Sequence, residues 1–378
     1  MPYYILAFAI YCFCIAVLIR SNATQSPVRI FVFGLLPAFF LVLFRGNVGT
    51  DTAAYLRIIS DIQNNGVTDL ELGFVLLIKT MLLIGMAPQF ILGAIACIST
   101  ALLLYAAQFS KRSLLLCALC IVPVFYFDIT MNGLRYGLSF ACVMCAVGLF
   151  YQKRLRLCVI FATCAILFHL SGWLLVLMMA FFADDKEEFT FWFVITIGLG
   201  VLILALQNFA QVLYLFNLNI AGEGVDLSNK VSAYSNFPSP SLLSGIGPLT
   251  LSLLALALIK KADDATQAVR LRRFYLLLLS AIGTFIIAKF SYAGLRLQFV
   301  VLFFMFLILQ FKPAFESISN VKTSRNILVI MTLVGLLGIA SFMKNALMTE
   351  SQGLSPWLPY SFNPELIHLL NFDSYSER

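Results

Sequence analysis

Charged residues are scarce in this sequence, making up 11% of its 378 residues, whereas soluble domains carry roughly 25%. That scarcity excludes a soluble globular protein. The membrane spans expected below also take up most of the chain length and leave no room for a separate soluble domain. Only two histidines are present, so ligands for a zinc centre are few. The spacings G-x-S-x-G and G-x-x-x-x-G-K-[ST] are absent, which leaves a serine hydrolase and a P-loop nucleotide site without support.

Apolar residues dominate instead: they form 61% of the chain, and the mean hydropathy is +0.95. Long apolar runs at this density predict an all-α polytopic membrane protein, because each spanning helix needs about 20 such residues. The first positive charge, Arg20, follows the N-terminal apolar run, so we expect a retained helix and not a cleaved signal peptide. We expect about twelve spans: 3–19, 30–44, 89–109, 113–127, 134–151, 156–169, 171–183, 189–206, 246–260, 272–289, 295–311 and 326–343.

The net charge of +7 carries orientation information, because cytoplasmic loops of membrane proteins collect Lys and Arg. Five dense basic clusters interrupt the apolar runs: Arg20/Arg29, Lys111/Arg112, Lys153/Arg154/Arg156, Lys260/Lys261/Arg270/Arg272/Arg273 and Lys312/Lys322/Arg325. All five can be cytoplasmic only under two conditions. Segment 72–86, which is short and carries Lys79, must be re-entrant or interfacial, and the run 156–183 must be two short helices broken near His169. In the alternative, 72–86 spans the membrane and at least one basic cluster lies outside.

On the first topology the chain is one integral membrane domain, 1–378, whose termini both lie outside. Its polar external segments are the loops 45–71 and 207–245 and the tail 344–378. Function is expected there, because loops on a rigid scaffold commonly carry the chemistry. The nine cysteines all lie in apolar stretches and are expected to be packing residues, neither disulfides nor metal ligands.

Four external cations, Arg45, Arg135, Lys289 and Arg296, lie at or just within the ends of expected helices. A charge at that depth must be paired or reach the headgroup level. One explanation is a shared anion, since guanidinium groups bind phosphate oxygens in a bidentate way, and a lipid phosphate or diphosphate is the anion expected there. The alternative is that each cation anchors its own helix.

The first external loop opens with Arg45-Gly46-Asn47-Val48-Gly49-Thr50-Asp51-Thr52. A glycine such as Gly49 lets the backbone approach a ligand closely, and backbone N–H groups in such turns can hold phosphate oxygens. Asp51 could be a general base that takes a proton from a sugar hydroxyl, or it could cap a helix starting near Thr52. The chemistry of the loop alone favours the cap.

His169 lies at the expected outer turn between two short helices. A histidine at that depth is a candidate base, phosphate ligand or hydroxyl partner; the alternative is a structural turn residue. Further along, Tyr234 and Tyr360 place aromatic rings and hydroxyls outside. Such rings can cover the apolar face of a pyranose, although interfacial aromatic belts have the same sequence signature.

Seven motifs follow one another between residue 44 and residue 360: FRGNVGTDTAAY (44–55), ELGF (71–74), NGLRYGLSFA (132–141), LFHLSGW (167–173), KVSAY (230–234), AGLRLQF (293–299) and WLPY (357–360). Taken together and in this order, they resemble the Wzy/EpsG-type bacterial polymerases of O-antigen and exopolysaccharide. A departure is Thr52, where many relatives have an aromatic residue after the aspartate.

The resemblance implies a GT-C-like glycosyltransferase in the bacterial inner (cytoplasmic) membrane, with its site facing the periplasm. It would transfer a growing glycan from undecaprenyl diphosphate to a lipid-linked repeat unit. No cofactor is expected, and the charge of two arginines could replace a metal at the leaving group. We expect inversion, because a retaining route needs a closely spaced carboxylate pair that the sequence does not identify. Partners would be the lipid-linked donor and acceptor, membrane lipids and, where chain length is controlled, a length regulator; nucleic acid is not expected. Alternatives are an O-antigen ligase-like transferase and a flippase or transporter, the last disfavoured because ionisable residues are nearly absent mid-span.

The resemblance also implies roles for single residues. Arg135 and Arg296 would bind the donor diphosphate, a leaving group whose developing charge they could stabilise. Asp51 and His169 would be the candidate bases. The remaining substrate-binding expectations are the first-loop residues Arg45, Gly49 and Glu71, the cation Lys289, and the glycan-path residues Tyr234 and Tyr360.

Overall fold

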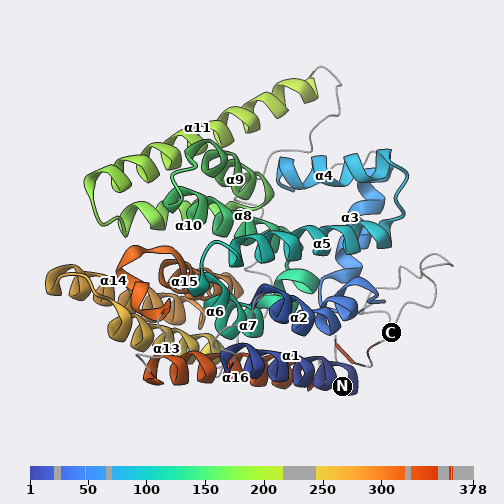
Figure 1. Ribbon diagram of the computed structural model, residues 1–378. Coiled ribbons are helices and arrows are strands. Elements are labelled where there is room, and N and C mark those ends of the chain that lie inside the picture. The colour runs from blue at the N-terminus through green and yellow to red at the C-terminus, as the bar shows by residue number, and fades with distance from the viewer. Residues whose placement is uncertain are drawn as a thin grey trace.

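The computed structural model describes residues 1–20, 27–46, 48–64, 70–215, 244–319, 325–347, 357–358 and 360, and within them every regular element is a helix (Figure 1). This confirms the expected all-α class. Tyr234, most of the loop 207–245 and most of the tail 344–378 lie outside the described residues.

The first half of the chain forms a bundle that includes one long helix made of four pieces, Lys111–Asn132. The elements are α1 Pro2–Arg20, α2 Pro27–Leu43, α3 Thr52–Gln63, α4 Leu72–Leu83, α5 Pro88–Ala107, α6 Lys111–Leu116, η1 Cys117–Ile121, α7 Val122–Phe127, η2 Asp128–Asn132 and α8 Leu134–Tyr151. The segments η1 and η2 are π-helical turns, a geometry that recurs at functional sites.

The second half continues the bundle. Its elements are α9 Leu155–Phe168, α10 Leu170–Phe181, α11 Lys186–Leu215, α13 Ile246–Ala262, α14 Gln267–Ile287, α15 Tyr292–Phe311, the 3-10 helix η3 Pro313–Ser319 and α16 Arg325–Leu347.

Two helices, α8 and α15, form the centre of the bundle (Figure 1). Nearly all of their residues beyond the first turn are buried, as expected for helices that are apolar on every side. Helices at the periphery expose large apolar side chains instead, among them Phe13 at 70% and Leu279 at 65%. Exposed apolar surface on this scale is typical of a face that meets lipid or a partner.

Helix ends gather at two ends of the bundle, about 30 Å apart along the 20 residues of α15. At the site end, the guanidinium of Arg45 after α2 donates to the carbonyl of Thr130 in η2, and Gln89 at the start of α5 donates to the carbonyl of Arg45.

At the opposite end, the guanidinium of Arg112 in α6 donates to the carbonyls of Gln310, Phe311 and Lys312, at the end of α15. The loop after α10 and the start of α11 reach the same end, where Glu188 is paired with Lys312.

The segment 72–86 does not run from one end of the bundle to the other. Glu71, before α4, pairs with Arg135 at the site end, and Gln89, just after the segment, contacts Arg45 at the same end. The 12 residues of α4 also span only about 18 Å. The geometry agrees with a re-entrant helix.

The expected break near His169 is also found: α9 ends at Phe168, and α10 begins at Leu170. Among the residues that the structure describes, six helices are long and apolar enough to cross a membrane: Pro2–Arg20, Pro88–Ala107, Lys111–Asn132, Leu134–Tyr151, Tyr292–Phe311 and Arg325–Leu347. Four shorter apolar helices accompany them: Pro27–Leu43, Leu72–Leu83, Leu155–Phe168 and Leu170–Phe181. The expectation of about twelve spans stays a prediction beyond these six.

All nine cysteines lie in helices within the described residues and are free; six of them are buried. The six buried cysteines pack inside the bundle as expected, whereas Cys12 is exposed.

The two-ended arrangement makes a testable prediction about sidedness. A cysteine at Asp61, exposed on α3 at the site end, and a cysteine at Thr266, exposed at the opposite end, should react with a membrane-impermeant maleimide from opposite sides. The background should carry Cys12→Ala, since Cys12 is the exposed native thiol. Equal labelling of both positions in sealed vesicles would contradict the orientation.

Candidate functional site

Arg45 is buried inside the site end of the bundle, only 2% exposed. Its Nη1 donates to the carbonyl oxygen of Thr130 at 2.7 Å, while its Nε and Nη2 are buried without a hydrogen-bond partner. Burial lowers the pKa of the guanidinium to about 10, and nearby Tyr55 and Tyr4 act in the opposite direction. In this structure Arg45 holds the η2 turn from within the protein, and it does not line the pocket described below.

Asp51 occupies the N-cap position of α3, but its side chain makes no capping hydrogen bond. The cap that the loop chemistry favoured is therefore wrong, although the helix does begin at Thr52 as expected. The carboxylate is half-buried and interacts electrostatically with Arg296 and Arg135. Burial raises its pKa above the ordinary value of 3.8, partly offset by those two cations, which makes it a stronger base.

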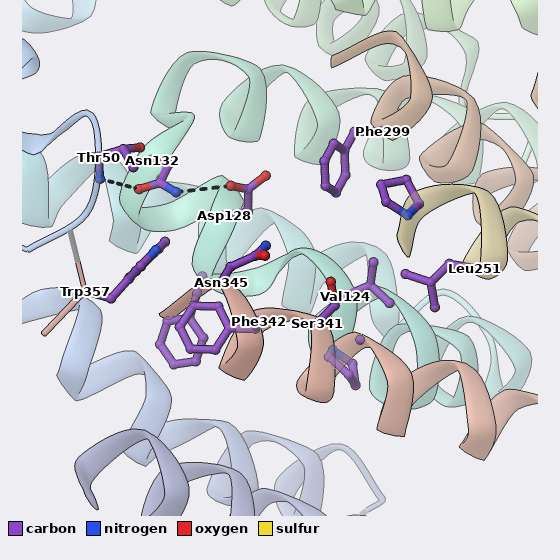
Figure 2. A pocket seen from close by; sticks show the side chains of 14 residues that line it. Thr50, Val124, Asp128, Asn132, Leu251, Phe299, Ser341, Phe342, Asn345 and Trp357 are labelled. Carbon is purple, nitrogen blue, oxygen red and sulfur yellow. Dashed lines mark hydrogen bonds between the residues drawn. The ribbon is translucent and has the colours of Figure 1, made fainter. Parts of the chain in front are cut away.

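A second carboxylate, Asp128, lies close to the first. It belongs to η2, at the end of an apolar helix, and accepts hydrogen bonds from the hydroxyl of Tyr136 and, at 3.2 Å, from Nδ2 of Asn132. It is coupled electrostatically to Asp51 and Arg296. Asn132 in turn accepts, at 3.0 Å, the N–H of Thr50, so η2 and the first loop are joined by the chain of bonds drawn in Figure 2.

Gly49 explains why the loop fits against η2 so closely. Its φ is +100°, and an added Cβ would lie 3.0 Å from Oδ1 of Asn132. Glycine is needed here both for the left-handed backbone and for the close approach. The backbone here approaches Asn132. The N–H of Thr50 donates to the side chain of Asn132, although the sequence suggested that N–H groups of this turn could hold phosphate oxygens.

Arg135 and Glu71 form an ion pair, with 2.7 Å between Nη1 and Oε2. Arg135 also hydrogen-bonds the side chain of Tyr55, and its Nε is buried without a hydrogen-bond partner. The structure therefore brings Arg135 of α8 together with Glu71 and Asp51 of the first loop, which the sequence assigned to a separate role from Arg135.

His169 caps α10. Its Nδ1 accepts the N–H of Ser171 at 3.1 Å and lies 2.7 Å from the Ser171 hydroxyl. Its ring meets the ring of Tyr136 edge to face, with centroids 6.3 Å apart. The capping contacts correspond to the structural alternative for this histidine, while the contact with Tyr136 links it to Asp128.

Of the remaining expected site residues, Arg296 is near the two carboxylates, whereas Lys289 and Tyr360 bind backbone carbonyls elsewhere. Arg296 is exposed near the start of α15 and interacts electrostatically with Asp51 and Asp128. Lys289 donates to the carbonyl of Ser244 at 2.6 Å and lies over the ring of Phe285. Tyr360 is buried and donates to the carbonyl of Leu41, which ties the tail to the end of α2.

A pocket of about 410 Å³ is lined by Asp128 and by Thr50, the residue before Asp51. Its volume is within the roughly 300–1,000 Å³ of small-molecule sites. Thr50, Asn132, Asp128, Asn345 and Trp357 gather toward one side of it (Figure 2). Sequence reasoning singled out neither Asp128 nor Asn345. A usable signal was available for Asp128: it ends a long apolar run and lies four residues before Asn132, the spacing that brings two helical side chains together.

Within the described part of the chain, no three His, Cys, Asp or Glu side chains are grouped so as to hold a metal ion. In a comparison with known protein families, the EpsG family model matches residues 28–362 of the chain. Neither the curated proteins nor the solved structures contain a match to the chain.

Proposed function

Because the chain belongs to the EpsG family, we propose that it is a membrane glycosyltransferase that polymerises a lipid-linked glycan. The family indicates a polysaccharide polymerase of the exopolysaccharide or O-antigen type, and the long apolar helices indicate a membrane protein. The proposed reaction transfers the growing glycan from undecaprenyl diphosphate to a second lipid-linked repeat unit, at the outer face of the cytoplasmic membrane.

One observation carries this proposal: two carboxylates and two guanidinium groups from distant segments converge beside a pocket at one end of the bundle. Asp51 is electrostatically coupled to Arg296 and Arg135. The residue that precedes it, Thr50, lines the pocket. A base next to cations is the combination required when a hydroxyl attacks carbon and an anion departs.

In the proposed step, the oxygen of an acceptor hydroxyl attacks the anomeric carbon of the donor glycan. Its proton passes to the carboxylate of Asp51. The bond between the anomeric carbon and the diphosphate oxygen breaks, and the electron pair leaves with the diphosphate. Arg296 stabilises the negative charge on the diphosphate, and Arg135, held by its ion pair with Glu71, adds to this stabilisation.

A single displacement of this kind inverts the anomeric centre. A retaining route would need a second carboxylate as nucleophile. Asp128 is the available candidate, but its oxygens accept hydrogen bonds from Tyr136 and Asn132, which makes it a weaker nucleophile.

The orientation is supported by the distribution of basic residues. Arg112, Arg273 and Lys312 gather at the opposite end of the bundle, which is the cytoplasmic end under the positive-inside rule. The proposed site then faces outward, and twelve passes of the chain connect the two ends.

The test is purified protein in nanodiscs incubated with one lipid-linked repeat unit. A ladder of longer lipid-linked glycans is expected. Transfer only to lipid A core would indicate a ligase, and the absence of any new glycosidic bond would indicate a transporter; either result would overturn the proposal.

Substitution of Arg296 tests the assigned role in leaving-group stabilisation. Arg296→Ala should lower kcat by about 100-fold, the usual cost of losing one group that stabilises developing charge, and Arg296→Lys should restore part of it. Arg325→Ala removes an exposed arginine at the opposite end and should leave the rate unchanged. Normal ladders from both Arg296→Ala and Arg135→Ala would show that the diphosphate assignment is wrong.

A further inference from the structure

The pocket at the site end has a polar side and an apolar side. Asp128, Asn132, Asn345 and Thr50 lie toward the end near Trp357, whereas Leu251 and Phe299 lie at the far end (Figure 2). A ligand that matches both sides is itself amphipathic, with hydrogen-bonding groups at one end and a hydrocarbon part at the other.

On the polar side, Asp128 is the group best placed to form hydrogen bonds with such a ligand. Its carboxylate is oriented by Tyr136 and Asn132, which fixes its direction within the pocket wall. A carboxylate offers about four acceptor positions, and these two donors leave acceptor capacity for the hydroxyl hydrogens of a ligand.

Other lining groups fit the same ligand chemistry. Asn345 and Ser341 offer an amide and a hydroxyl from α16, and Trp357 and Phe342 contribute aromatic rings to the wall. A sugar ring matches this combination, because its hydroxyl rim can bond to the amides and the carboxylate while its C–H face packs on an aromatic surface.

The charge of the residues that line the pocket limits which sugars can bind there. Of the fourteen described residues that line the pocket, Asp128 is the one with a charged side chain. A second carboxylate placed beside it would be repelled by Asp128, because none of the other thirteen described lining residues carries a positive charge. Arg296, which is coupled to Asp128, is also coupled to Asp51 and is not among these lining residues. Such repulsion is an effective source of selectivity.

We propose that this pocket binds the acceptor sugar of the lipid-linked repeat, and that Asp128 restricts that sugar to an uncharged pyranose by accepting its hydroxyl groups and repelling uronic acids. This inference rests on the proposed function in one respect: the sugar is assigned as the acceptor because Thr50 in the pocket wall directly precedes the proposed base, Asp51. The apolar side then holds the first part of the lipid.

The test measures binding and does not require polymerisation. Wild-type protein in nanodiscs is titrated at pH 7 with hexyl β-glucoside and with hexyl β-glucuronide, below their micelle concentrations, while tryptophan fluorescence is recorded. The glucoside should give a saturable change and bind at least roughly tenfold more tightly, equivalent to about 1.4 kcal/mol. Trp357→Phe should remove the change, because the other two tryptophans do not line the pocket.

Asp128→Asn should bring the two affinities to within about threefold of each other, because it removes the repelling charge. The matched control, Asp61→Asn on the exposed part of α3, should keep the wild-type preference. Equal binding of both glycosides by wild-type protein, an unchanged preference in Asp128→Asn, or no signal from Trp357 would overturn the inference. Retained binding in an inactive Asp51→Asn variant would separate this site from the catalytic assignment.

Discussion

Replacing Asp51 with asparagine is expected to lower the polymerisation rate by a factor of roughly 10²–10⁴, the usual contribution of a positioned general base. The carboxylate makes no capping bond in α3, so its removal should not destabilise the helix start. The measurement is the rate of ladder formation from a lipid-linked repeat, together with a melting curve that should match the wild type.

The pH dependence gives an independent check on the same residue. Burial raises the pKa of Asp51 above 3.8, and the active base is the deprotonated form. Activity should therefore fall as the pH drops through that raised pKa, which places the acid limb of kcat/KM above pH 3.8. The residual activity of Asp51→Asn should lack this limb.

Asp61→Asn is the matched control, since Asp61 is exposed on the same helix and lines no part of the pocket. Its rate should equal that of the wild type. If Asp51→Asn polymerises at the normal rate, or keeps the acid limb, another group takes the proton and the assignment fails.

Lys312→Met is expected to destabilise the fold by about 3–5 kcal/mol, the typical cost of breaking a buried ion pair from one side. The ammonium is fully buried and lies 3.1 Å from Oε1 of Glu188 and 3.3 Å from Oδ2 of Asp184. Burial lowers the pKa of Lys312 to about 8, opposed by Glu188, so the group is still mainly protonated at pH 7.

Those contacts belong to a larger cluster that fastens the opposite end of the bundle. Arg273 pairs with both Asp184 and Asp263, and the hydroxyl of Tyr151 donates to Glu188. Removing the lysine leaves two acidic side chains near each other without their shared cation. Unfolding midpoints in detergent and the recovery of monodisperse protein measure the loss.

Lys261→Met, at an exposed lysine of the same end, is the control and should change the midpoint little. Lys312→Arg should retain part of the stability because it keeps the charge. An unchanged midpoint in Lys312→Met would mean that the cluster does not hold the helices together.

Several local features could be predicted from the sequence because they depend on neighbours along the chain. The break at His169, the helix start at Thr52 and the short segment 72–86 are set by apolar run lengths and by the residues that interrupt them. The family resemblance placed Asp51 and Glu71 in one first-loop site and Arg135 on the donor diphosphate, but it did not predict the ion pair between Arg135 and Glu71.

Other features could not be predicted, because they depend on how helices are rotated against each other. Arg45 was expected to bind substrate and instead turns inward to the carbonyl of Thr130. Asp51 matched a cap by position, but its side chain makes no capping bond and is coupled electrostatically to Arg296 and Arg135. Asp128 escaped notice because a single aspartate at the end of an apolar run does not reveal which partners will surround it.

By itself, the sequence determined that this protein is a bundle of membrane helices with its polar groups at the helix ends. Apolar runs of this length leave the backbone no other way to satisfy its hydrogen bonds in lipid. Only the tertiary structure decided which of those polar groups share a site. The position of a charged residue along its helix, and hence its depth in the membrane, follows from the sequence. The direction in which its side chain points depends on packing against helices that are distant in the chain.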